Sequence, residues 1–111
     1  MAVSKIANPN RIKDWSYLGS TTADAHITIS SGYKDIKCLA YVENNMNQVI
    51  VFSINANYVD ARTYRSGYYY SSSDYYSVSI HNDTSGGWWG WNAVRNGSSV
   101  LDTTKFYWFA R

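Results

Sequence analysis

The chain has 111 residues and a formal net charge of +2, with basic and acidic residues interspersed along its length. This length suits one domain, the absence of a basic stripe argues against a nucleic-acid partner, and no apolar run approaches the roughly eighteen residues needed for membrane insertion. The single cysteine, Cys38, excludes an intrachain disulfide and a thiolate metal cluster, and its apolar surroundings predict a small buried residue.

The composition favours strands over helices. Aromatic residues make up 17% of the chain, with 11 tyrosines and 5 tryptophans, whereas charged residues make up 16%. Glu43 is the only glutamate, and glutamate is among the residues that surface helices favour. Tyrosine, tryptophan and β-branched residues favour strands. We therefore expect an all-β protein whose solvated surface is carried by Ser, Asn and Tyr, a composition often seen in extracellular and viral β-proteins.

The chain begins with a segment that carries no strand pattern. The first ten residues end in an Asn-Pro-Asn turn signal, so residues 1–13 are interpreted as a leader, arm or linker before one domain over residues 14–111. A first strand is expected over residues 15–19, where a glycine closes it. A second strand is expected over residues 25–29, which alternate strictly and stop at a Ser-Ser-Gly cluster.

The next two segments form the clearest strand pair. One face of residues 36–42 carries Ile36, Cys38, Ala40 and Val42, and the other carries Lys37, Leu39 and Tyr41. Residues 48–54 follow an asparagine-rich loop, where asparagine tolerates the positive φ that turns need. They are apolar on both faces, which is typical of a central strand covered on two sides. The two segments are predicted to form a hairpin.

The second half of the chain reads as further strands separated by polar loops. Residues 55–61 break the pattern and could hold one helical turn or a crossover. Strands are expected over residues 62–70 (with a candidate bulge at Gly67), 75–81, 88–95 and 103–110. Asn96-Gly97 is the strongest hairpin turn signal, because both residues accept a positive φ. About eight short strands with turns every eight to twelve residues predict an antiparallel, jelly-roll-like β-sandwich.

Residues able to do chemistry are few and lack a catalytic or metal-binding spacing. His26, His81, Cys38 and scattered aspartates do not match a zinc pattern. The aspartates mostly occupy turns, where they hydrogen-bond the local backbone, and this disfavours a carboxylate-pair glycosidase. Asp83 could bind calcium weakly, but a loop role is favoured. We therefore expect no enzyme, no cofactor and no metal.

Consecutive aromatic residues must place rings on both faces of a strand. In the segment 75–81 the core is expected to take Tyr76, which leaves Tyr75 outward. In the segment 88–95, Trp89 and Trp91 share one face, and Trp88 lies with a glycine and an asparagine. Trp88 is therefore the best candidate for exposure.

Outward aromatic rings have two interpretations. Exposed Tyr and Trp combine a large contact area, low rotamer entropy and a polar handle, which suits a binding surface. They could instead only pack as cross-strand pairs at an edge. If they bind, the candidate ligand- or partner-binding residues are Tyr68, Tyr70, Tyr75, Trp88 and Asn92.

The order of segments resembles a module of phage and prophage tail proteins. The matching segments are residues 14–19 (DWSYLG), 27–29 (ITI), 31–36 (SGYKDI), 65–69 (RSGYY) and 106–108 (FYW) with Arg111. The likeness covers nearly all of residues 14–111 and implies the C-terminal β-sandwich-type module of tail or tail-fibre receptor-binding proteins, with no catalytic residues. Such modules usually end longer proteins, which leaves open whether this one is an excised domain or a small free-standing protein.

The expected function is a non-catalytic phage tail or tail-fibre domain for host-surface attachment or tail assembly. The resemblance implies a location in the virion tail after synthesis in the bacterial host cytoplasm. It also implies a host cell-surface glycan or protein, or neighbouring tail subunits, as partners, and a homotrimer as an oligomeric state, because such tips are commonly trimeric. The alternative is an extracellular carbohydrate-binding module or lectin of cellular origin.

Overall fold

The computed structural model describes residues 14–57, 62–71 and 74–111, with side chains for residues 14–57 and 75–111. The strands are β1 (Ser16–Thr22), β2 (His26–Thr28), β3 (Asp35–Tyr41), β4 (Val49–Asn55), β5 (Arg62–Ser71), β6 (Asp74–Asn82), β7 (Gly87–Arg95), β8 (Ser98–Ser99) and β9 (Lys105–Ala110). Two single-turn 3-10 helices follow β3 and β8, over Val42–Asn44 and Leu101–Thr103. No helix within these ranges is long and apolar enough to cross a membrane. The all-β prediction is confirmed.

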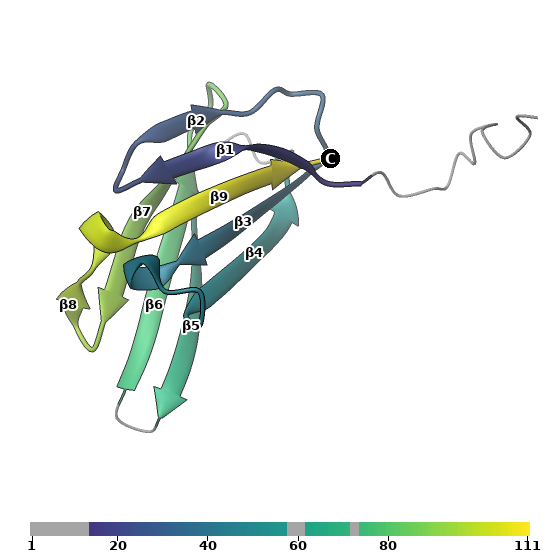
Figure 1. Cartoon of the computed structure of the whole chain (residues 1–111). Coiled ribbons are helices and arrows are strands. Elements are labelled where there is room, and N and C mark those ends of the chain that lie inside the picture. The colour runs from purple at the N-terminus through teal and green to yellow at the C-terminus, as the bar shows by residue number, and fades with distance from the viewer. Residues whose placement is uncertain (1–13, 58–61, 72–73) are drawn as a thin grey trace, which may run out of the picture.

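The strands form two antiparallel sheets that pack face to face (Figure 1). Sheet A has the order β1-β9-β3-β4, and sheet B has the order β2-β7-β6-β5, with β8 added beside β7. β1 pairs with β9 and β2 pairs with β7, so strands from both ends of the chain lie side by side in each sheet, as in a jelly roll. The middle of the chain runs through consecutive hairpins, β3-β4 and then β5-β6-β7. This is the predicted antiparallel sandwich.

The core consists of the inward residues of alternating strands. On β3, Ile36, Cys38 and Ala40 are fully buried, and on β9 the fully buried residues are Phe106, Trp108 and Ala110. Intervening residues on both strands are only partly buried. The predicted division of β3 into two faces is confirmed, and β9 divides in the same way, because a period of two is a direct consequence of strand geometry.

Two turns follow the predicted chemistry. Asn96 and Gly97 have φ values of 50° and 87°, and β7 pairs with β8 on either side of them, as a two-residue hairpin requires. In the β3–β4 connection, Glu43 and Asn44 have φ values of 55° and 54°. Asparagine was expected in this conformation, and a neighbouring glutamate shares it.

Strand β4 corrects one expectation. It is the edge strand of sheet A, not a central strand covered on two sides. Ile50 and Phe52 point into the core, but Val51 is 53% exposed and Ser53 is also exposed. Apolar residues on both faces indicated cover on both sides, but the outer face of sheet A has no covering layer among the described residues.

The β4–β5 region corrects a second expectation. Gly67 pairs regularly with Ser77, and the irregularity in β5 lies between Tyr69 and Ser71, so the bulge predicted at Gly67 is wrong. β4 and β5 belong to different sheets, which agrees with a crossover between residues 55 and 62. The alternative helical turn falls partly on residues 58–61, which lie outside the described residues, as does the predicted leader over residues 1–13.

Candidate binding surfaces

The inner side of β7 is occupied by residues that sequence reasoning placed outward. Trp88 is only 3% exposed, and its ring lies 6.3 Å from the ring of Trp108 between the sheets. The prediction that Trp88 is exposed is therefore wrong. The reason is Gly90, the next inward residue: a Cβ there would lie 2.1 Å from the Phe106 ring. The glycine marks the close approach of a core phenylalanine and not a solvent-facing surface.

A β-bulge sets the outer side of β7. Ser79 pairs with Asn92 but Ile80 pairs with Gly90, so Trp91 is an extra residue in β7. After the bulge, Ala93 takes the next fully buried position, and Asn92 is half-buried. Trp91 is 48% exposed, the value expected of a ring that projects into solvent. Bulges often re-aim a side chain near functional sites in this way.

Trp91 belongs to an aromatic cluster on the outer face of sheet B, which we call the tryptophan face: His26, His81, Trp89 and Trp91. The His26 ring stacks on Trp89 with centroids 4.0 Å apart and planes 13° apart. His81 meets Trp89 edge-on at 4.8 Å and Trp91 at 6.3 Å. Residues from β2, β6 and β7 thus build a continuous, aromatic and partly exposed surface whose polar groups are imidazole and indole N–H groups.

The other predicted candidates are only partly brought together. Asn92 follows Trp91 directly. Tyr75 is 37% exposed, as predicted, but it lies near the start of β6 beside Asn96, whose Oδ1 accepts a 2.8 Å hydrogen bond from the Tyr75 backbone N–H. His81 lies six residues further along β6, roughly 20 Å away at about 3.3 Å per residue. Tyr75 is thus at the opposite end of the sheet from Trp89.

Tyr68 and Tyr70 are placed by backbone alone, since their side chains lie outside the described residues. Tyr68 pairs with Tyr76, whose own side chain is buried in the core as predicted. Tyr70 lies within the register shift between Tyr69 and Ser71. Their role in binding stays a prediction.

The outer face of sheet A is a second aromatic surface, and it was not singled out from the sequence. Its rings contact each other and nearby cations. Tyr17, 56% exposed, lies 5.3 Å from Phe109, and the Lys37 ammonium lies 5.0 Å from the Phe109 ring centroid and 4.6 Å from that of Trp15. The Arg111 guanidinium lies 4.2 Å from the Trp15 centroid. Several ring faces here are therefore occupied by side chains of the chain itself.

The turn between β6 and β7 is organised by Asp83. Its Oδ1 accepts hydrogen bonds from the Ser85 and Gly87 backbone N–H groups and from the Ser85 hydroxyl, each at 2.9 Å. The bonds from Gly87 and then Ser85 hold the pKa of this carboxyl below its ordinary value. The loop role predicted for Asp83 is confirmed. Within the described ranges, no three His, Cys, Asp or Glu side chains gather as metal ligands would.

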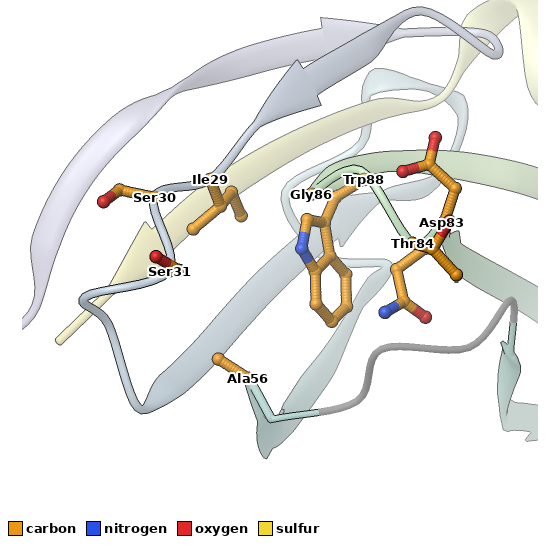
Figure 2. Close-up of a pocket in the computed structure, with 9 residues that line it drawn as sticks. Ile29, Ser30, Ser31, Ala56, Asp83, Thr84, Gly86 and Trp88 are labelled. Carbon is orange, nitrogen blue, oxygen red and sulfur yellow. The ribbon is translucent and has the colours of Figure 1, made fainter.

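A small pocket opens at the end of the sandwich, beside this turn. Its volume is about 120 Å³, and the Ile29–Ser31 segment, Ala56, the Asp83–Thr84 turn and Trp88 contribute to its lining. Figure 2 shows the Trp88 indole standing between the Ile29–Ser31 segment and the Asp83–Thr84 turn. Trp88 therefore lines a small cavity, although its ring belongs to the core. Sequence periodicity offered no signal for a site assembled from three connections.

Cys38 is fully buried, as predicted, and burial raises the pKa of its thiol well above the ordinary value. A protonated thiol inside the core is a poor nucleophile. Cys38 therefore acts as a small apolar residue of β3.

No protein-family model matches the chain, and comparisons with curated proteins and with solved structures find no match either. The fold and its surfaces define an all-β sandwich with one open aromatic face and one aromatic face whose rings meet cations. Any function proposed for the chain must therefore be argued from these surfaces and from the sequence.

Proposed function

We propose that this domain is a non-catalytic attachment module of a phage tail or tail fibre, and that it binds a host-surface glycan through the tryptophan face. The observation that carries the proposal is the exposure of Trp91 at a β-bulge beside the Trp89–His26 stack. An indole in this setting offers a flat apolar surface, on which the C–H face of a sugar ring can pack, next to N–H groups that can donate to sugar hydroxyls.

Folding alone does not account for Trp91. An indole that is 48% exposed leaves much of its apolar area in water, so that area contributes little to the free energy of folding. Trp89 is held in place by rings on both sides, His26 at 4.0 Å and His81 at 4.8 Å. A rigid ring pair loses little conformational entropy when a ligand binds, which favours recognition.

The phage-tail assignment is supported by the resemblance over residues 14–111 and by a surface rich in Ser, Asn and Tyr. Tail tips are commonly symmetric oligomers, so the assembly part of the proposal can be tested separately. Size-exclusion chromatography with light scattering is expected to give a trimer. A strict monomer at all concentrations would count against the assembly role and leave attachment to be tested by binding.

Attachment is tested by incubating the fluorescently labelled chain with a panel of Gram-positive and Gram-negative cells and with their purified wall polysaccharides. We expect Trp91→Ala to reduce binding at least about tenfold, because hot-spot aromatics dominate such contacts. The matched control is Tyr17→Ala, which removes a ring of similar exposure (56% against 48%) from sheet A and is expected to bind as the unmodified chain does. Equal binding by both variants, or no binding to any cell, would contradict the proposal.

The second candidate is a carbohydrate-binding module of cellular origin, which the same ring arrangement favours. A glycan array separates the two candidates by the source of the bound sugar. Binding to plant or storage polysaccharides would favour the module, whereas binding to bacterial wall glycans would favour the phage protein.

A further inference from the structure

The two core tryptophans differ in what their indole N–H groups do. The Trp108 Nε1–H donates a 2.9 Å hydrogen bond to Thr21 Oγ1 inside the core. The Trp88 indole N–H, by contrast, donates to no other residue in the described part of the chain. The Trp88 ring is buried, but its Nε1 is not among the fully enclosed atoms that lack a hydrogen-bond partner, so solvent reaches this N–H. An acceptor on a bound ligand can take the place of that solvent.

The pocket beside Trp88 is where such an acceptor can reach. Figure 2 shows the indole nitrogen on the side of Ile29 and Ser31, two of the residues that line the pocket. The volume of about 120 Å³ exceeds the space one water needs but is below the roughly 300–1,000 Å³ of a site for a whole small molecule. The pocket therefore has room for one substituent of a larger ligand.

The residues that line the pocket limit which chemical groups can fit there. Ile29, Ala56 and the Trp88 ring supply apolar surface, and the Trp88 N–H supplies a hydrogen-bond donor. The polar residues of the lining are Ser30, Ser31, Asn82, Asp83 and Thr84. A group that fits must combine a small apolar end with an acceptor. An acetamido group does so, with a methyl group for the apolar side and a carbonyl oxygen for the indole N–H.

The pocket and the tryptophan face lie on opposite sides of sheet B, next to its short edge strand β2. Ile27 pairs with Trp88, whose ring faces inward, and His26 pairs with Trp89, whose ring lies on the outer face. β2 has three residues and is the outermost strand on its side of sheet B, apart from the short β8. A ligand that occupies both sites must therefore be chain-like and pass around the edge of the sheet at β2.

We propose that the pocket binds the acetamido group of an N-acetylated amino sugar and serves as the specificity subsite of the tryptophan face. This inference rests on the proposed glycan binding and adds the class of sugar. The carbonyl oxygen accepts from the Trp88 N–H, the methyl group packs against Ile29 and Ala56, and the sugar chain continues to Trp89 and Trp91.

The test uses two tetrasaccharides, N-acetylated chitotetraose and cellotetraose, which differ only in the C2 substituent of each sugar. Their binding to the full chain is measured by isothermal titration calorimetry. Cellotetraose has a hydroxyl where chitotetraose has the acetamido group. Chitotetraose is expected to bind at least about tenfold more tightly, because the shorter hydroxyl of cellotetraose has no methyl group to fill the apolar part of the pocket and no carbonyl oxygen to reach the Trp88 N–H. If the pocket holds only water and takes no part in sugar binding, the two tetrasaccharides are expected to bind equally.

Two variants assign that discrimination to the pocket. Trp88→Phe keeps an aromatic ring but removes the N–H, and Ala56→Leu places a larger apolar side chain in the lining of the pocket and keeps the tryptophan. Each is expected to bring chitotetraose binding down to the level of cellotetraose. Ala25→Leu, an equally small change at an exposed position outside the pocket, is the matched control and is expected to keep the preference.

The outcomes separate this inference from the proposed function. Equal binding of the two tetrasaccharides, no binding of chitotetraose, or a preference that survives Ala56→Leu would overturn the acetamido subsite. If cells are still bound through Trp91 in those cases, glycan attachment stands without it. Loss of the preference in Ala56→Leu, together with cell binding that depends on Trp91, would support both.

Discussion

The inner and outer faces of sheet B use the same residue type for opposite purposes. On β7, Trp88 is 3% exposed and packs near Trp108, whereas Trp91, three residues away, is 48% exposed beside His81. The two tryptophans differ because their faces of sheet B are covered differently. β9 contributes Phe106 and Trp108 opposite the inner face, whereas no described residue covers Trp91 on the outer face. A tryptophan is therefore assigned to core or surface by what lies opposite it, and its immediate sequence neighbours are a poor guide.

The largest loss of stability is expected from Trp88→Ala. Removing a buried indole loses its apolar burial and leaves a cavity, so the free energy of unfolding should fall by about 3–5 kcal/mol. Urea denaturation followed by circular dichroism measures this change. A loss below about 1 kcal/mol would mean that Trp88 is not a core residue and would break the comparison.

Gly90→Ala tests the same inner face from the other side. The new methyl group would overlap the Phe106 ring, which is fully buried and has little room to move. Overpacking of this kind should cost about 1–3 kcal/mol. Phe106→Leu in the Gly90→Ala background should recover part of the loss, and a double-mutant cycle measures the coupling. Strictly additive effects would show that the two residues do not compete for space.

Asp83→Asn tests the turn between β6 and β7, and it should lower the free energy of unfolding less than Trp88→Ala or Gly90→Ala does. The pKa of folded Asp83 lies below its unfolded value of about 3.9, so its charge stabilises the fold above that pH. That contribution disappears as the pH falls through the folded pKa. The unmodified chain should therefore lose more stability than the variant between pH 7 and pH 3 in parallel urea titrations. Identical losses would show that Asp83 does not contribute to the acid dependence.

The smallest effect on stability is expected from Trp91→Ala. Its ring contributes little burial, so the free energy of unfolding should change by no more than about 0.5 kcal/mol. Differential scanning calorimetry measures this, and the same sample should show the loss of cell binding described above. A loss of stability comparable to that of Trp88→Ala would show that Trp91 contributes to the fold as a core residue does.

Much of the fold could be predicted from local patterns. The alternation in β3 placed Ile36, Cys38 and Ala40 on one face, which is the buried one, and the Asn96-Gly97 pair identified the β7–β8 hairpin. These predictions succeeded because side-chain alternation and the φ values of turns are properties of the local backbone. Tyr75 and Tyr76 were assigned to the correct faces for the same reason.

The candidate site could be predicted only in part. The sequence identified Trp89 and Trp91 as sharing a face, but it could not show that this face is the outer one or that Trp91 occupies a bulge. Nor could it bring His26 onto Trp89, because the two residues are 63 positions apart and meet only through the β2–β7 pairing. Pairing between distant strands depends on which hydrophobic faces cover each other, and the local sequence pattern does not predict this.

The amino-acid sequence by itself determined the strands, most of their two-sided character and the chemistry of the turns, because these depend on residues within a few positions of one another. Tertiary structure alone decided that β4 is an edge strand, that Gly90 makes room for Phe106, and that three connections enclose a pocket beside Trp88. Each of these depends on contact between segments far apart in the chain, where packing volume and not local propensity selects the arrangement.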